Sequence, residues 1–170
     1  MKKPRSGLKR RSLMRWALKE LSNVARGWRS IQLGRLTLSE LMTYYAATPV
    51  TVEDRVLIIR INRLYRHNMS AHDMYEATRG VWRLGDRRRG AAYAFAVFEG
   101  VVREVYRIES WHPAGSTPYT TRTNAELTVE GRWEFCGTVA DAQIRERYVD
   151  RSVGAYFKKG QQSPVTYVNC

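Results

Sequence analysis

The chain has 170 residues, 44% of them hydrophobic and 26% charged, and a formal net charge of +13. This length suits one domain with a terminal extension, and the ordinary balance of apolar and charged residues excludes a wholly disordered chain. No apolar run approaches the roughly 20 residues of a membrane-spanning helix, and two cysteines exclude a dense disulfide framework, so we expect a cytoplasmic globular protein.

The excess positive charge lies in the first ninety residues. Residues 1–30 contain ten Lys or Arg and one acidic residue, whereas residues 91–170 contain nine of each sign. Clustered like charge repels itself, and a polyanionic partner is the simplest reason for a protein to retain it. We expect that partner to be nucleic acid, RNA or DNA, rather than anionic lipid. The alternative is that the basic residues only keep the protein soluble.

Residues 1–48 are predicted to be a basic extension. Residues 1–12 lack apolar periodicity and indicate a flexible arm, whereas apolar residues from Met14 to Trp28 recur at helical spacing. A second short helix is predicted to end near Ala47. The basic face of the first helix could meet a polyanion, a membrane surface, or a protein partner such as a nuclease. The nucleic-acid contacts predicted in this extension are Arg10, Arg11, Arg15 and Lys19.

Residues 49–170 are predicted to form an α+β nucleic-acid-binding domain. The Glu99-Gly100 pair indicates a tight hairpin, and Ser70 with Asp73 indicates a helix start whose end is a left-handed Gly80. Hairpin connections without a repeated βα unit favour a small mixed or antiparallel barrel-like sheet with flanking helices. The predicted strands are 56–62, 91–98, 101–108, 132–139 and 165–168, and the predicted helices are about 70–79 and 141–148.

A basic turn, Leu84-Gly-Asp-Arg-Arg-Arg-Gly90, follows the first of these helices. Guanidinium groups bond phosphate or a guanine edge in a fork, and an indole offers a face on which an unpaired base stacks. The alternative is that the tryptophan belongs to the core and the arginines form a solvated turn. The candidate contact residues here are Arg79, Trp82, Arg83, Arg87, Arg88 and Arg89.

The strand 101–108 contains charged residues among apolar ones. Simple alternation puts Arg103 on the face of Val101 and Val105, and Glu104 on the other face. This pattern predicts a buried ion pair or, less favoured, a polar pocket in a barrel mouth. The loop that follows, from residue 111 to 131, is long for a compact domain and retains aromatic and hydroxyl residues, as binding loops often do. Its candidate contact residues are Trp111, Tyr119 and Arg122.

Several segments of residues 56–170 resemble an uncharacterised bacterial domain. They include YEATRGVW from Tyr75, YAFAV from Tyr93, VREVY from Val102 and PVTYVN from Pro164. That domain can follow a GIY-YIG nuclease module, which implies an accessory role in a nucleic-acid-processing or defence system. This chain has no GIY-YIG pair, so nuclease chemistry does not transfer. The strand order also resembles the PUA-like barrels, the group of the EVE and ASCH domains, which implies RNA or modified-base binding in a cleft.

Catalytic motifs are absent from the sequence. The three histidines have no metal-ligand spacing, and there is neither a phosphate-binding glycine loop nor a nucleophile elbow. We therefore expect no cofactor and no metal site, and a binding module rather than an enzyme. Glu76, Glu104 and Glu134 remain acids that could meet in space. The alternatives are a metal-independent RNase that uses Arg79, Glu104 and Tyr106, or a non-catalytic adaptor for a protein partner.

Overall fold

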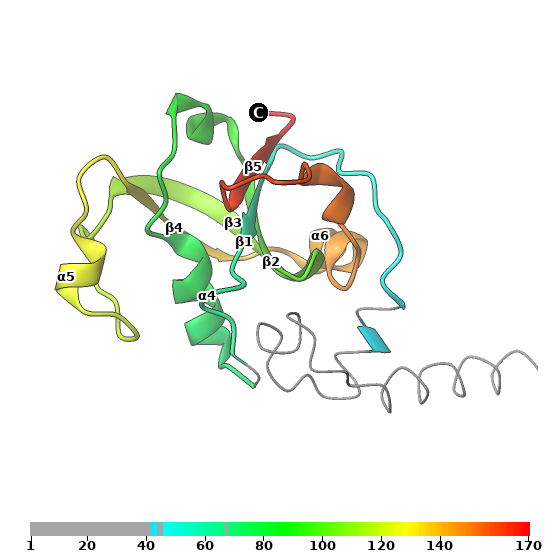
Figure 1. The fold of residues 1–170 in the computed structure, drawn as a ribbon, viewed down its shortest axis with the longest axis horizontal. Helices are drawn as coiled ribbons and strands as arrows, with labels where there is room; N and C mark the ends of the chain where they lie inside the picture. The colour runs from blue at the N-terminus through cyan, green and yellow to red at the C-terminus, as the bar shows by residue number, and fades with distance from the viewer. Residues whose placement is uncertain (1–41, 44–45, 67) are drawn as a thin grey trace, which may run out of the picture. The chain divides into compact units, whose positions relative to one another are not determined.

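In a computed structural model, residues 42–43, 46–66 and 68–170 are described, and they contain a five-stranded mixed sheet with helices on its faces (Figure 1). The predicted basic extension lies for the most part outside these residues. The strands are β1 (Val56–Arg60), β2 (Tyr93–Phe98), β3 (Val101–Pro113), β4 (Trp133–Val139) and β5 (Val165–Val168). The helices are α4 (Ala71–Arg79), α5 (Asn124–Leu127) and α6 (Ala142–Tyr148), with 3-10 turns η1 (Asp86–Gly90) and η2 (Gly154–Tyr156).

The strand order is β4-β3-β2-β1-β5. β1 and β2 are parallel and joined through α4, and the other neighbouring pairs are antiparallel. The α+β class and the predicted order of strands and helices are confirmed, but the predicted barrel is wrong because the sheet does not close. The crossover through α4 places β1 inside the sheet, and helices then cover both apolar faces, so no closed interior is needed to bury them.

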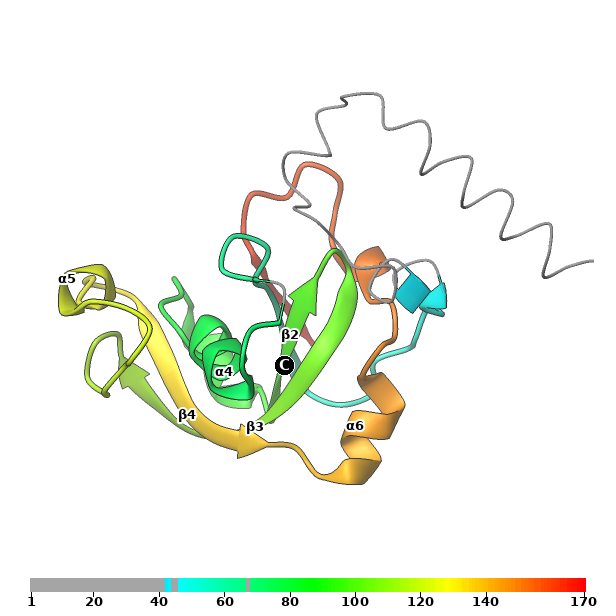
Figure 2. The same ribbon diagram turned by 90° about the horizontal axis from the view of Figure 1, so that it is seen from below.

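Two separate cores lie on the two faces of the sheet. One contains Val56, Ile58 and Phe95 and packs against Ile144 and Tyr148 of α6. The other packs against α4 and contains alternate residues of the same strands, among them Leu57, Ile59, Ala94 and Ala96. β1 and β2 are therefore apolar on both faces, as expected of central strands. Figure 2 shows α4 and α6 on opposite sides of the β2–β3 pair, and these sides are called the α4 side and the α6 side below.

The turn and cap predictions are confirmed at two of three positions. Ser70 accepts a hydrogen bond from the Asp73 amide, and the Asp73 carboxylate accepts one from the Ser70 amide, which completes a capping box. Glu99 and Gly100 have φ values of 48° and 79°, as a tight hairpin requires. Gly80, however, is extended at φ −171° and not left-handed, so the reason for a glycine there is different.

A bulge in the β2–β3 ladder overturns the predicted face assignment of β3. The register shifts between Ala96 and Val97, so Val102 and Val105 both face the α6 side. Arg103 and Glu104 do not pair with each other. Arg103 lies 4.0 Å from Asp150, and Glu104 pairs with Arg145 of α6. An extra residue of this kind re-aims side chains, and periodicity alone does not reveal it.

The long loop predicted over 111–131 is shorter in the structure. β3 continues to Pro113, and α5 interrupts the remainder. Over the described part of the chain, no helix has the length and apolar character needed to cross a membrane.

Candidate nucleic-acid interface

The segment from Val81 to Gly90, called the basic loop below, is anchored where it leaves α4. At its start, Trp82 and Trp133 exchange two backbone hydrogen bonds of 2.9 and 2.8 Å. The Trp82 indole N–H donates to the Thr78 carbonyl of α4 at 2.7 Å. Trp82 is half-buried, and the only polar atom of its side chain is already bonded within the fold. It can therefore contact a ligand only through the exposed part of its ring.

Arg88 is a structural residue of this loop. Its side chain is 4% exposed, and its guanidinium carbon lies 3.5 Å from the centroid of the Trp133 ring. The guanidinium also donates to the Gly85 carbonyl at 3.0 Å and to Asp86 at 3.1 Å. This cation–π contact and these bonds hold the turn together, so Arg88 is not available to a ligand.

Arg87 is exposed, and contacts within the fold hold its side chain in place. Its guanidinium donates to the main-chain oxygen of Cys170, from Nε at 2.8 Å, and lies 4.9 Å from the centre of the Tyr167 ring. Arg89 is 73% exposed and lies 3.8 Å from Asp86. Arg83 is exposed, and no carboxylate in the described ranges pairs with it. The basic loop thus presents three guanidinium groups to solvent.

Arg79 points into the protein. It is 4% exposed, donates to Thr117 Oγ1 at 2.7 Å and to the Pro118 carbonyl at 2.5 Å, and stacks 3.7 Å from the Tyr119 ring centre. Tyr119 supplies the ring of this stack, so both predicted contact residues have structural contacts inside the protein. They fasten the segment 115–123, called the threonine loop below, to the end of α4.

Two buried carboxylates hold the same loop through its backbone. Glu76 accepts from the amides of Thr120 and Thr121 at 2.8 and 2.7 Å. Glu134 accepts from the amides of Gly115 and Thr117 at 3.0 and 2.8 Å. Burial by itself would raise the pKa of each, but these hydrogen bonds lower the pKa of both below the usual range. The two acids are therefore charged, and each of them holds the threonine loop in place by bonding its main-chain amides.

Gly80 is explained by close approach. A Cβ atom at this position would lie 2.5 Å from Tyr119 Oη and 2.8 Å from Glu134 Cβ. Burial, the largest cause, together with the nearby Glu134 carboxylate, raises the pKa of Tyr119 despite Arg79. The hydroxyl therefore stays neutral beside the carboxylate, and only a glycine leaves room for it.

Arg122 caps the C-terminal end of α4. It is half-buried and donates to the carbonyls of Glu76 and of Gly80, the latter at 2.6 Å. A cation is favoured at this end of a helix, where carbonyl groups lack intrahelical partners. Trp111 is also half-buried, with its ring 5.7 Å from that of Phe135 in an edge contact.

The residues proposed for an RNase do not assemble into a site. Glu104 forms two hydrogen bonds of 2.8 and 2.9 Å with Arg145, Tyr106 is 2% exposed, and Arg79 has the partners given above. No hydrogen bond or ion pair among the described residues joins any two of the three. In the same part of the chain, no three His, Cys, Asp or Glu side chains gather closely enough to hold a metal ion.

The arginines of the two sides differ in what holds them. On the α6 side most of them pair with carboxylates: Arg145 with Glu104, Arg147 with Asp54 and Glu53, and Arg103 with Asp150 after α6. Arg60 is the exception on that side, because it donates to the carbonyls of Gln161 and Ser163. On the α4 side they bond mainly main-chain oxygens, as Arg122 does with carbonyls. Arg66 follows this second pattern, because it donates to the carbonyls of Arg63 and Tyr65 at 3.1 Å each. We call these the carbonyl-held arginines.

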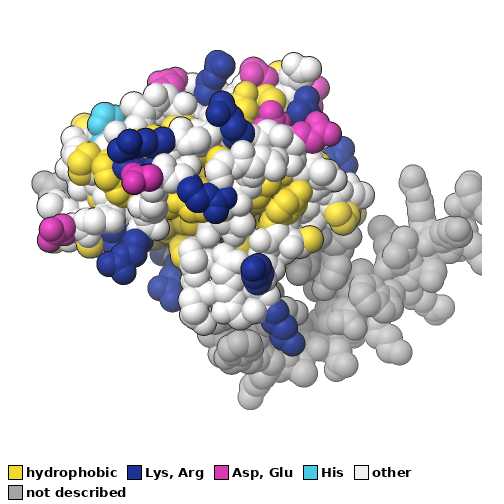
Figure 3. Space-filling model, turned by 90° about the horizontal axis from the view of Figure 1, so that it is seen from above, with side chains coloured by type: hydrophobic (Ala, Val, Ile, Leu, Met, Phe, Trp, Pro, Cys, Tyr) yellow, Lys and Arg dark blue, Asp and Glu magenta, His cyan; other side chains and the backbone are white. Residues whose placement is uncertain are grey.

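Figure 3 shows the face that carries the basic loop and the end of β5. Lys and Arg side chains are spread across it among hydrophobic ones, and acidic side chains lie mostly toward its rim. The predicted contacts Arg10, Arg11, Arg15 and Lys19 lie outside the described residues. Arg66 was missed by sequence reasoning, because an isolated arginine carries no signal when its partners are main-chain carbonyls.

No family model, no curated protein and no solved structure matches the chain.

Proposed function

We propose that the protein binds nucleic acid through the exposed arginines of the basic loop, Arg83, Arg87 and Arg89. The observation that carries the proposal is that three guanidinium groups of one short loop face solvent. Arg83 pairs with no carboxylate in the described ranges, and Arg89 is 73% exposed. Arg87 is also exposed, and a main-chain oxygen and an aromatic ring hold its guanidinium in place.

Arg87 has N–H groups that are not used within the fold. It donates from Nε and Nη2 to the main-chain oxygen of Cys170, and a guanidinium has five N–H groups in a planar fork. The remaining N–H groups are available to a phosphate, and no conformational search is needed to place them. Arg83 and Arg89 add charge within the same short loop.

The charge distribution of the whole chain supports the same partner. Residues 1–41 contain 11 of the 29 Lys and Arg residues and only two of the 16 acidic ones. Such a segment adds a second set of phosphate contacts, with counterion release as the driving force. The resemblance to a domain that follows a nuclease module fits an accessory role, in which this protein holds a strand while a partner acts on it.

The test is a salt series of binding isotherms. Fluorescence anisotropy with labelled single-stranded RNA, single-stranded DNA and duplex DNA measures the slope of log K against log salt. We expect Arg83→Ala, Arg87→Ala and Arg89→Ala combined to lower the magnitude of this slope by about 2 to 3, because each phosphate contact contributes roughly 0.7 to 0.9. Affinity that does not change with salt would contradict the proposal.

The matched control removes three positive charges from the other end of β1. Arg63, Lys158 and Lys159 are exposed, and they lie near Arg60, which donates to the carbonyls of Gln161 and Ser163. Their combined change to Ala is expected to lower the slope by less than 1. Equal slopes for the two triple variants would mean that only net charge matters and that the basic loop is not the interface.

A further inference from the structure

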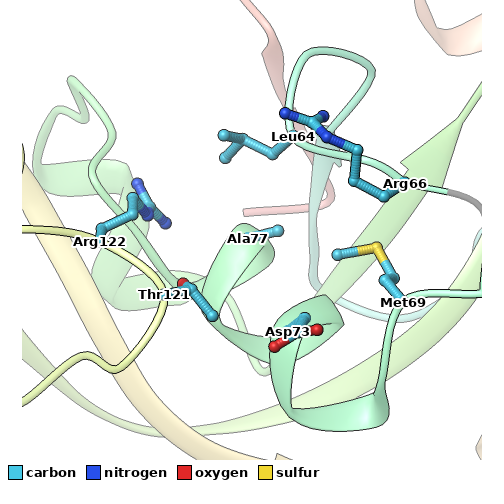
Figure 4. Close-up of a pocket in the computed structure, with 7 residues that line it drawn as sticks. All are labelled: Leu64, Arg66, Met69, Asp73, Ala77, Thr121 and Arg122. Atoms are coloured by element: carbon cyan, nitrogen blue, oxygen red, sulfur yellow. The ribbon is translucent and has the colours of Figure 1, made fainter.

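A pocket of about 300 Å³ lies beside α4, between the segment that follows β1 and the threonine loop (Figure 4). Its volume is at the lower end of small-molecule sites. Arg122 stands on one side and Arg66 with Met69 on the other, with Asp73 near one end. The residues that line it are Leu64, Arg66, Met69, Asp73, Ala77, Thr121 and Arg122.

Both cations of the pocket are carbonyl-held. Arg122 is fixed by the last carbonyls of α4, and Arg66 by the carbonyls of Arg63 and Tyr65. Neither arginine has a carboxylate partner among the described residues. The pocket therefore presents two positioned positive charges at its rim, which suits a phosphate-bearing ligand.

Asp73 supplies the only carboxylate of the lining. Its Oδ2 atom accepts one long hydrogen bond of 3.4 Å from the Ser70 amide. Its Oδ1 atom accepts none from the residues that the structure describes. An acceptor is thus open at one end of a pocket whose other walls include Leu64, Met69 and Ala77.

These groups together match one nucleobase better than the others. An apolar wall contacts the flat faces of a base, and a carboxylate accepts hydrogen bonds from N–H groups on its edge. Guanine presents two neighbouring donors, N1–H and N2–H, on its Watson–Crick edge. Adenine, cytosine and uracil each place an acceptor beside the donor there, which a carboxylate repels.

We infer that this pocket binds an unpaired guanine of the bound strand, with Asp73 reading the base edge and the two arginines holding adjacent phosphates. The inference rests on the proposed nucleic-acid binding and specifies its substrate as single-stranded and guanine-containing. The pocket connects to the basic loop through Arg122, which bonds the carbonyl of Gly80, the residue that precedes the loop. We therefore expect one strand to contact both.

The experiment compares two labelled single-stranded 12-mers, one all-adenine and one with a single central guanine, on the full chain at one salt concentration. A single guanine prevents the probe from forming a quadruplex. We expect about tenfold tighter binding of the guanine probe, the size of one well-formed bidentate base contact. Asp73→Asn should remove this preference without weakening the binding of the adenine probe, because it removes a negative charge.

Two further variants separate recognition from folding. Met69→Trp fills the pocket without changing charge and should also remove the preference. Glu130→Gln removes a charge at an exposed position and should leave the preference intact. Equal binding of both probes, or a preference that survives Asp73→Asn and Met69→Trp, would overturn the guanine inference and leave the proposed function standing. No binding of either probe would overturn both.

Discussion

The α4 side and the α6 side differ in the usual partners of their charged side chains, with Arg60 as the exception on the α6 side. On the α6 side, Glu104 takes two hydrogen bonds from Arg145, so acid and base neutralise each other. On the α4 side, Glu76 and Glu134 bond main-chain amides, and Arg122 bonds main-chain carbonyls. The difference teaches that the partner of an arginine, and not its presence, decides whether its charge reaches solvent.

There is a physical reason why charged side chains on the α4 side bond main-chain groups. The threonine loop crosses the end of α4 without pairing as a strand, so its amides need acceptors that secondary structure does not supply. Buried carboxylates satisfy these amides, and no ion pair joins Glu76 or Glu134 to an arginine in the described part of the chain. Arg122 then serves the carbonyls at the helix end. Asp86 is the exception on this side, because it pairs with Arg88 and Arg89.

The largest expected effect is a loss of stability on changing one of the acids that bond main-chain amides. Glu134 is fully buried and accepts three hydrogen bonds, so Glu134→Gln should lower the free energy of unfolding by about 3 kcal/mol. Urea denaturation at neutral pH measures this change. Glu130→Gln is the control at an exposed position of the same chain region. A loss below about 1 kcal/mol would show that the threonine loop is held by other contacts.

The same acids predict how stability depends on pH. The pKa of Glu134 is lower in the folded protein than the ordinary value of about 4.3. A lowered carboxyl pKa contributes stability that is present above the unfolded-state pKa and is lost as the pH falls through the folded-state pKa. The wild-type melting temperature should therefore fall below about pH 4 more steeply than that of Glu134→Gln. If the melting temperatures of the two proteins fell equally steeply below about pH 4, the loss of stability could not be assigned to Glu134.

The next effect in size contrasts one arginine from each side. Arg145→Gln leaves Glu104, whose side chain is 18% exposed, without its cation, and should cost about 1 to 2 kcal/mol. Arg87→Gln removes only exposed bonds to the main-chain oxygen of Cys170 and should cost at most about 0.5 kcal/mol. Binding should show the reverse order, with a weaker affinity for nucleic acid in Arg87→Gln alone. Equal effects on both measurements would erase the distinction between the two sides.

The smallest expected effect is on binding, and it comes from changing Asp86, the acid that pairs with arginines on the α4 side. Asp86→Asn removes the carboxylate that partly neutralises the basic loop, and it should tighten binding by about two- to threefold at low salt. Glu146→Gln makes the same change of charge at an exposed position of α6 and should change affinity less. Equal gains from both substitutions would indicate that net charge alone governs binding.

Local patterns predicted most of the framework of this protein. The predicted cap Ser70 begins α4, and a helix was expected where α6 lies. Alternation and turn residues predicted all five strands, although β3 ends at Pro113 and not at residue 108. These features depend on neighbours in the chain, so a sequence contains them. The bulge at Ala96, the extended Gly80 and the open sheet were not predicted, because each depends on contacts between distant segments.

The features of the candidate site can likewise be separated into those that the sequence predicts and those that depend on the tertiary structure. The sequence by itself determined that this chain is strongly basic and that arginines cluster after α4. Only the tertiary structure decided that Arg79 and Arg88 lie in the interior and that Arg66 joins Arg122 and Asp73 around a pocket. The reason is that the charge available to a ligand depends on what each guanidinium bonds, and here those partners are main-chain atoms that look alike at every position of a sequence.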